Sequence, residues 1–381
     1  MRIAISTMVD QPDVKSGVGQ VVTNLLSELQ IYGDNHEYNL LTFSNDNTFT
    51  AKERPDFHII KSRLHSASSW QRILWNQTAL PYFIKKNRID VLHIPVADLF
   101  VKACPTVVTI EDLAEYHLSG KYSPTRMRYR KLILPVIARR ADHIITVSET
   151  SKADIMKFLK VPDDKISVIY HGINSRFKPM IKTDAQKALM QKYDIEGPYL
   201  LYVGRIMHPS KNLVKLIHAY HSLKTAGRIP HRLILAGKND WGHEEVHRTV
   251  KDLGLCKEVI FTGYVPDDDL PLFYNAADAL VFVSLHEGFG MPVTEAMACG
   301  LPVITSNTSS LKEIAGEAGL LTDPHSTDAV AHCIETLISD KNMQEDLSKK
   351  GLQRSLIFSW QKTAKDYIRV YETLASQNIR H

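Results

Sequence analysis

The feature of this sequence that most constrains its fold is the alternation of short apolar runs with amphipathic stretches along most of the chain. The apolar runs of strand length lie near residues 2–6, 38–43, 57–60, 90–94, 106–110, 143–147 and 166–170, and again near 198–204, 232–236, 258–262, 278–283 and 302–305. Between the first two runs, one helix face carries Val21, Val22, Leu25, Leu26 and Leu29. This alternation is typical of parallel sheets with helices on both faces, so we expect an α/β fold with two Rossmann-like halves.

A break in the pattern divides the chain into two predicted domains. Residues 171–179 contain glycine and proline, which interrupt helices and strands and are typical of a linker, and the strand pattern restarts after them. Before the break, Ser148 and Ser151 suit the start of a helix, with Asp154 as an acid of the capping-box type. We expect one domain over 1–175 and a second over 176–359, and the 381 residues are enough for two cores.

Composition indicates a globular protein of the cytoplasm. Of the residues, 44% are hydrophobic and 23% charged, and no apolar run approaches the roughly 20 residues that cross a bilayer. The chain enters a predicted strand almost at once, so we expect no signal peptide. The cysteines are isolated, which favours a reducing compartment and no metal site. Histidines such as His93, His117 and His171 have no metal-ligand spacing and are expected to be neutral or packed.

Positive charge is concentrated in the first half of the chain. Residues 1–180 hold 24 Lys and Arg against 18 Asp and Glu, whereas the remainder holds 22 against 24. The basic groups are Arg126, Arg128, Arg130 and Lys131, then Arg139 and Arg140, and also Lys85, Lys86 and Arg88. Each run taken alone is explained by a solvated helix face, and together they are consistent with an anionic membrane surface or a lipid diphosphate. With a net charge of only +4 and no binding module, we expect no nucleic-acid partner.

The densest chemical signal is a glycine turn between two predicted strands, over residues 284–304. It places Glu287 and Glu295 at the two ends of a turn that opens a helix, with Pro292 in the first helical turn and Gly300 just past the helix end. The expected ligand-facing positions of the turn are Gly288, Phe289, Gly290, Met291 and Val293, with free N–H groups at Gly290, Met291 and Val293. Such N–H groups bind anions, and carboxylates accept hydrogen bonds from hydroxyls. A diphosphate joined to a sugar uses both. The alternative is that both glutamates are ordinary acids of a helix start.

Two further segments suit a phosphorylated ligand. After the strand near 198–204, Arg205 and Lys211 lie six residues apart, which allows two cations to flank one diphosphate. A solvated arginine and a lysine at a helix start are the alternative, although a cation there opposes the helix dipole. Gly17 and Gly19 precede the first amphipathic helix and permit close backbone approach to a phosphate or sugar, although a flexible turn explains them equally well.

The two glutamates, the glycine turn between them and the following Glu-Ala-Met-Ala-x-Gly sequence closely resemble the E-x(7)-E motif of family 4 glycosyltransferases, which are retaining enzymes of the GT-B fold. Gly204-Arg205 with Lys211-Asn212-Leu213 resembles the motif with which the family binds the donor diphosphate. The resemblance covers nearly the whole chain. It implies two Rossmann-like domains that face a cleft, the first binding the acceptor and the second the nucleotide sugar. It also implies a C-terminal helix, residues 360–381, that returns to the first domain.

The resemblance also implies roles for single residues. Arg205, Lys211 and backbone N–H groups would stabilise the leaving diphosphate in place of a metal, Glu287 would orient the sugar, and Glu295 would hold the ribose. Backbone groups near Val265 would hold the base. Relatives often have histidine where this chain has Glu111, which is followed by the matching Asp112. An ionised carboxylate cannot donate a hydrogen bond, so Glu111 is a candidate for binding a hydroxyl of a different sugar or of the acceptor, while Asp112 is equally explained as a turn cap.

The function that these observations predict is transfer of a mannose-like or glucose-like hexose from a nucleotide-diphosphate sugar to a glycan or polyprenol-linked acceptor, in bacterial surface polysaccharide synthesis. We expect no cofactor besides this co-substrate and no metal, and reversible docking of a cytoplasmic enzyme on the membrane. A sugar-nucleotide epimerase of the same fold and a non-catalytic sugar-binding partner are the competing interpretations. Nucleotide release with and without acceptor would distinguish them.

Overall fold

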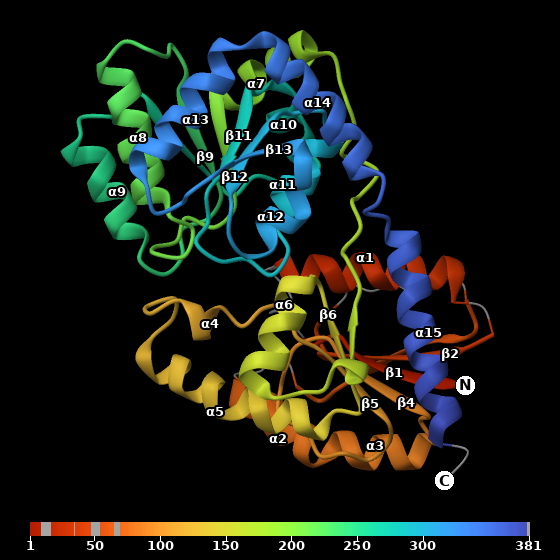
Figure 1. Ribbon diagram of the computed structural model, residues 1–381. Helices are drawn as coiled ribbons and strands as arrows, with labels where there is room; N and C mark the ends of the chain where they lie inside the picture. Colours follow the sequence, from red (N-terminus) through yellow and green to blue (C-terminus); the bar gives the residue numbers. More distant parts are fainter. Residues whose placement is uncertain (9–16, 34, 47–53, 65–68, 379–381) are drawn as a thin grey trace. The chain divides into compact units, whose positions relative to one another are not determined.

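The computed structural model describes residues 1–8, 17–33, 35–46, 54–64 and 69–378 (Figure 1). The chain forms two compact units. Unit 1 comprises Met1–Leu113, Arg128–Gly172 and Ser359–His381, and unit 2 comprises Ala114–Met127 and Ile173–Phe358. The division after Gly172 falls within the predicted linker, whereas residues 114–127, which the sequence pattern assigns to the first domain, group with unit 2.

Unit 1 contains a parallel sheet with the strand order β3-β2-β1-β4-β5-β6-β7. Its strands are β1 (Arg2–Ser6), β2 (Glu37–Thr42), β3 (Phe57–Lys61), β4 (Val91–Ile94), β5 (Thr106–Thr109), β6 (His143–Thr146) and β7 (Ile166–Val168). All seven strands predicted for the first half are present, with slightly shifted ends. The strands β4 and β5 are buried throughout, because a parallel sheet is covered on both faces.

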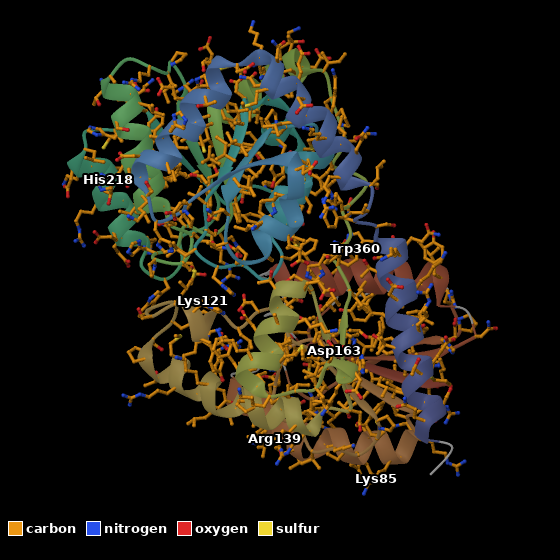
Figure 2. The ribbon with its side chains drawn as sticks, in the orientation of Figure 1. Lys85, Lys121, Arg139, Asp163, His218 and Trp360 are labelled. Carbon is orange, nitrogen blue, oxygen red and sulfur yellow. The ribbon has the colours of Figure 1, made fainter. Side chains whose placement is uncertain are left out.

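The helices of unit 1 cover this sheet (Figure 1). They are α1 (Gly17–Tyr32), α2 (Ser69–Gln77), α3 (Ala79–Asn87), α6 (Glu149–Asp154), the π-helix η1 (Ile155–Leu159), the 3-10 helix η2 (Asp163–Lys165) and α15 (Trp360–Asn378). The helix α5 (Pro124–Arg140) begins in unit 2 and continues in unit 1. The predicted apolar face of α1 is buried, and α15 packs against α1. The prediction that the last helix returns to the first half of the chain is therefore confirmed; Trp360 marks its start in Figure 2.

Two local predictions for unit 1 were wrong. Gly17 and Gly19 lie in the first turn of α1 and not in a loop before it, because the helix begins at Gly17; Ser16 lies outside the described residues. At α6 the N-cap is Ser148, whose hydroxyl accepts a hydrogen bond from the Ser151 N–H at 3.0 Å. Asp154 is the last residue of α6 and therefore cannot act as its capping-box acid.

Unit 2 contains a second parallel sheet, with the order β10-β9-β8-β11-β12-β13. Its strands are β8 (Tyr199–Val203), β9 (Arg232–Ala236), β10 (Val259–Gly263), β11 (Ala279–Phe282), β12 (Val303–Ser306) and β13 (Gly319–Thr322). Five of them were predicted. The sequence pattern missed β13, a four-residue edge strand that starts at a glycine and is only half-buried over most of its length.

Helices lie on both faces of the second sheet (Figure 1). The helices of unit 2 are α4 (Ala114–His117), which does not cover the sheet, α7 (Lys182–Tyr193), α8 (Leu213–Thr225), α9 (His243–Asp252), α10 (Leu270–Ala276), α11 (Met291–Ala298), α12 (Ser309–Ala315), the 3-10 helix η3 (Gly316–Ala318), α13 (Thr327–Ser339) and α14 (Lys341–Ser355). The central strands β8 and β11 are buried along their whole length, and their carboxyl ends lead into the loops that carry Arg205 and Glu287. Ligands of open α/β sheets bind at these ends.

Among the helices that the structure describes, none combines the length and the apolar character needed to cross a bilayer.

Candidate functional site

The glycine turn after β11 has the backbone geometry that the sequence predicts. Gly290 occupies the N-cap position of α11 with φ +103°, and a Cβ there would lie 2.6 Å from the Leu311 side chain. Pro292 stands in the first turn of α11, and Gly300 has φ +73° just past the C-cap Cys299. Only glycine adopts the Gly290 conformation without strain, so this residue fixes the path of the chain into the helix.

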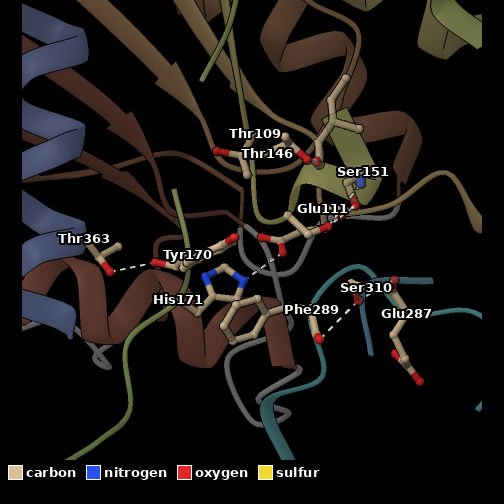
Figure 3. A network of polar contacts seen from close by, with 12 residues as sticks. Thr109, Glu111, Thr146, Ser151, Tyr170, His171, Glu287, Phe289, Ser310 and Thr363 are labelled. Atoms are coloured by element: carbon tan, nitrogen blue, oxygen red, sulfur yellow. Dashed lines mark hydrogen bonds and ion pairs between the residues drawn. The ribbon is translucent and has the colours of Figure 1, made fainter. Parts of the chain in front are cut away.

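The N–H groups of the turn are partly available to a ligand. Val293 donates to the Gly290 carbonyl at 2.9 Å, so the prediction of a free N–H at Val293 was wrong. Among the described residues, the N–H groups of Gly290 and Met291 have no acceptor. The Ser310 hydroxyl bonds the carbonyls of Glu287 at 2.9 Å and Phe289 at 3.1 Å, which holds the turn from α12 (Figure 3). Two N–H groups therefore remain as anion donors at the start of an eight-residue helix.

The other two predicted residues of the turn are buried. Gly288 is buried, and the ring of Phe289 packs edge-on against the ring of Phe358 with centroids 5.6 Å apart. The Phe289 ring therefore serves the core of unit 2.

Lys211 and Glu287, which the sequence placed in separate motifs, form an ion pair. The Lys211 Nζ lies 2.6 Å from the Glu287 Oε1, and the two side chains are only 20% and 15% exposed. Lys211 also lies 5.5 Å from the centre of the Phe282 ring. The neighbouring Asn212 donates to the carbonyls of Val283 at 3.1 Å and Pro324 at 2.7 Å, which ties the loop before α8 to the end of β11.

Arg205 has a different partner. Its Nη1 lies 2.6 Å from Asp240 Oδ2, and its side chain is half exposed. Burial alone would raise the pKa of Asp240, but the hydrogen bonds from Arg205 and the Trp241 N–H and the charges of Arg205 and Arg126 lower it below its ordinary value. The sequence reading missed Asp240, because no local spacing links it to Arg205. Each cation of the proposed diphosphate site thus has its own carboxylate.

Glu295 is held by a residue that the sequence reading also missed. The Tyr274 hydroxyl on α10 donates to Glu295 Oε2 at 2.7 Å. Burial raises the pKa of Glu295 to about 7, although the bond from Tyr274 acts in the opposite direction. Glu295 is therefore poised to exchange its proton near neutral pH, and an incoming hydroxyl would favour its ionised form.

Val265, the predicted contact of the base, is buried at 4% exposure in the loop that follows β10. That loop starts at Gly263 with φ +68°, and the Pro266 carbonyl accepts the Asp269 N–H at 2.9 Å. The whole residue is thus buried, and contact of its backbone with a base stays a prediction.

First-half residues 114–127 also contribute to unit 2. The ring of His117 stacks on His286 with centroids 4.4 Å apart and planes 18° apart, and the Gly120 carbonyl accepts the Trp241 indole N–H at 3.0 Å. His286 precedes Glu287, and Trp241 follows Asp240. This segment therefore contacts the neighbours of two of the charged residues.

The other predicted site residues, Glu111, Asp112, Gly17 and Gly19, belong to unit 1. Glu111 follows β5, and its Oε2 lies 2.9 Å from Nε2 of His171 (Figure 3). Its carbonyl accepts the Ser151 hydroxyl at 2.9 Å. Asp112 is half-buried beside it, and Gly17 and Gly19 begin α1. His171 is packed, as predicted, but its ring is paired with Glu111, a predicted site residue, which the sequence reading did not foresee.

Comparison with known proteins agrees with this architecture. Residues 15–177 match the family described as Glycosyltransferase Family 4, and residues 186–354 match Glycosyl transferases group 1. The O-antigen chain mannosyltransferase B of Escherichia coli is 34% identical over 296 residues, which cover 77% of this chain and 73% of that protein. This chain is a family 4 glycosyltransferase.

Solved structures place the family 4 glycosyltransferase among proteins of the GT-B fold. A sucrose-phosphate synthase from Thermosynechococcus elongatus superimposes with a TM-score of 0.80 at 21% identity, covering 99% of this chain and all of that one. WaaG, a glycosyltransferase involved in lipopolysaccharide biosynthesis, gives a TM-score of 0.75 at 16% identity, with 97% of this chain and 99% of that one covered. At these identities the likeness concerns the fold.

Proposed function

We propose that this family 4 glycosyltransferase moves a mannose-like or glucose-like hexose from a nucleotide-diphosphate sugar to a glycan or polyprenol-linked sugar, with retention of configuration and without a metal. The observation that carries the proposal is the Lys211–Glu287 pair, 2.6 Å apart, beside the turn whose Gly290 and Met291 N–H groups have no acceptor among the described residues. A cation, two N–H donors and a carboxylate together match a sugar diphosphate.

The charges of unit 2 suggest how the donor is activated. In the proposed reaction the bond between the sugar C1 and the diphosphate oxygen breaks, a bond from C1 to the acceptor oxygen forms, and the acceptor proton passes to a donor phosphate oxygen. Lys211 and Arg205 would move from their carboxylates towards the leaving diphosphate and stabilise its growing charge. Glu287, released from Lys211, would accept hydrogen bonds from the hexose hydroxyls.

The nucleotide would occupy the neighbouring part of unit 2. Glu295, already bonded to Tyr274, would accept the ribose hydroxyls, and the backbone near Val265 would contact the base. In unit 1 we assign sugar recognition to Glu111 and Asp112, and phosphate or sugar contact to the start of α1 at Gly17 and Gly19. The Escherichia coli relative is named an O-antigen chain mannosyltransferase, which supports mannose as the hexose and a surface polysaccharide as the product.

The proposed lipid-linked acceptor would require contact with a membrane. Five basic side chains of α5 are exposed, namely Arg126, Arg128, Lys131, Arg139 and Arg140, and Arg130 is half-buried. Arg139, at the end of the same helix, and Lys85 on α3 are marked in Figure 2. No acidic residue occurs in α5. Such a surface is attracted to anionic lipids, so we propose peripheral docking on the cytoplasmic face.

Incubation with GDP-mannose, UDP-glucose and other nucleotide sugars tests the proposal. We expect nucleotide release from one donor, stimulated by a glycan or lipid-linked acceptor and insensitive to a chelator, and a product with the anomeric configuration of the donor by NMR. Conversion of the donor to its epimer without acceptor would indicate an epimerase. Binding without turnover of any donor would indicate a non-catalytic partner.

A further inference from the structure

The proposed reaction does not explain why Glu111 is paired with His171 in unit 1. The two residues are 60 positions apart in sequence, and the His171 side chain is 3% exposed. An ionised carboxylate can only accept, so the Nε2–H of His171 donates to Glu111 Oε2. Figure 3 shows the imidazole turned towards the carboxylate.

The backbone around His171 is clamped by α15. The Thr363 hydroxyl donates to the Tyr170 carbonyl at 2.7 Å, and a Cβ on Gly172 would lie 2.1 Å from the Trp360 nitrogen. The Trp360 ring stacks on His171 with centroids 5.9 Å apart. The imidazole therefore cannot move far from Glu111 without disturbing the start of α15.

The other oxygen of Glu111 is unsatisfied. Within the described part of the chain, Glu111 Oε1 is buried and has no hydrogen-bond partner. A buried carboxylate oxygen without a donor is costly, and such atoms in folded proteins call for a partner. His171 fixes Oε2, so a donor from outside the chain would meet Oε1 in one defined orientation.

We propose that His171 is a positioning residue that holds the Glu111 carboxylate so that Oε1 accepts a hydrogen bond from a sugar hydroxyl. The inference rests on the proposed function, because the hydroxyl belongs either to the donor hexose or to the acceptor glycan. Where the family resemblance implies a histidine that donates, this chain has an acceptor at 111 and an imidazole behind it. The expected consequence is a site selective for a hydroxyl in donating orientation.

A double-mutant cycle tests the pair in the full chain. H171F keeps a ring against Trp360 but removes the donor, E111Q removes the charge, and H171Q retains an Nε2–H donor. We expect H171F and E111Q each to lower kcat/KM for transfer by about ten-fold or more, the double variant to lose no more than the worse single variant, and H171Q to recover part of the loss. Affinity for the free nucleotide, which binds in unit 2, should not change.

The matched control is T363V, which removes the bond from α15 to the Tyr170 carbonyl and leaves the pair intact. An equal loss in T363V and H171F would show that only packing matters and would overturn the inference. Wild-type kinetics in H171F, or losses that multiply in the double variant, would overturn it too. If H171F does not fold, the double variant E111H/H171E, in which the two residues are exchanged, tests the proposal instead. We expect this variant to melt cooperatively and to transfer the sugar poorly. Full transfer activity would contradict the role of Glu111 Oε1.

The source of the hydroxyl follows from the same variants. Slow donor hydrolysis without acceptor should fall with transfer if the donor hexose is bound, and should be spared if the acceptor is bound. If the wild-type protein hydrolyses and transfers no nucleotide sugar, the proposed function fails, which is distinct from a failure of His171 alone.

Discussion

At the scale of single residues, the ionisable groups of unit 2 are arranged in pairs that a ligand would have to rearrange. Lys211 bonds Glu287, Arg205 bonds Asp240, and Glu295 accepts from Tyr274. In the free protein the charges of Lys211 and Arg205 are each compensated by a carboxylate, whereas Glu295 is bonded to a neutral hydroxyl. In the proposed reaction a diphosphate would compete for the cations and leave the carboxylates available to hydroxyls.

Replacement of either cation should slow transfer without a requirement for metal. We expect Arg205→Ala or Lys211→Ala to lower turnover by about 10²-fold, comparable to the loss of one oxyanion stabiliser. Steady-state nucleotide release measures this, with the exposed Lys251→Ala as control. Near wild-type turnover in both variants, or loss with chelator that added metal restores, would contradict the mechanism.

Glu295 should make stability depend on pH. Its pKa of about 7 in the folded state lies above the ordinary value of 4.5. Between these values the folded state holds a proton that the unfolded state has released, so stability falls as pH rises from 4.5 to 7 and stays reduced above 7. Glu295→Gln should remove this loss, on the order of 3 kcal/mol at most. Denaturation at pH 5 and pH 8 measures the free energy of unfolding of both proteins. If the difference between the variant and the wild type were the same at both pH values, the raised pKa of Glu295 would be refuted.

The two glutamates of the motif should affect different steps. Glu295→Gln should weaken nucleotide binding, because ribose hydroxyls lose an ionised acceptor worth roughly 1.5–3 kcal/mol, and wild-type binding should tighten as pH rises through about 7. Glu287→Gln should mainly reduce transfer. Calorimetry with the free nucleotide separates them, and equal losses of affinity in both variants would reject the division of roles.

At the scale of elements, the site depends on how loops leave β8 and β11 and how helices start. The Ser310 hydroxyl of α12 holds the turn before α11, and Asn212 links the start of α8 to the end of β11. These contacts bring Lys211 to Glu287. The geometry of the turn is therefore as important to the site as the charged side chains.

Gly290→Ala tests the turn. The alanine would be forced into a left-handed conformation at φ +103° and against Leu311, so we expect a loss of about 1–2 kcal/mol in stability and weaker nucleotide binding. Gly254→Ala, at φ +69° with nothing within 4 Å of the new Cβ, is the matched control for conformational strain alone. Equal nucleotide affinity in the two variants would show that the turn does not contact the ligand.

At the scale of the whole molecule, the two units share one architecture but not one charge. Each has a parallel sheet with a strand-order reversal beside its first strand. Unit 1 holds 24 Lys and Arg against 19 Asp and Glu, whereas unit 2 holds 22 against 23. α15 brings the end of the chain back to unit 1, while residues 114–127 join unit 2. Each unit is thus assembled from separate stretches of sequence.

Removal of basic charge from α5 should weaken membrane docking. Changing Arg126, Arg128, Arg130 and Lys131 to Gln should lower binding to anionic liposomes and transfer to a lipid acceptor, because each such cation contributes about 1 kcal/mol near the membrane. Donor hydrolysis should persist, and salt should reduce wild-type binding. Gln at Lys187, Lys251, Lys349 and Lys350, all exposed in unit 2, is the control. If the wild-type protein does not bind anionic liposomes at low salt, the proposed docking is wrong.

The sequence by itself determined the two parallel sheets, the buried face of α1 and the glycine geometry at Gly290 and Gly300, because strands, helices and turns depend on neighbouring residues. It also identified the charged residues of the proposed site. Tertiary structure alone decided their partners. Lys211 and Glu287 are 76 positions apart and Glu111 and His171 are 60 apart, so these pairs depend on the path of the chain through the sheets. The same holds for Tyr274 beside Glu295, whose raised pKa arises from burial that no local pattern encodes.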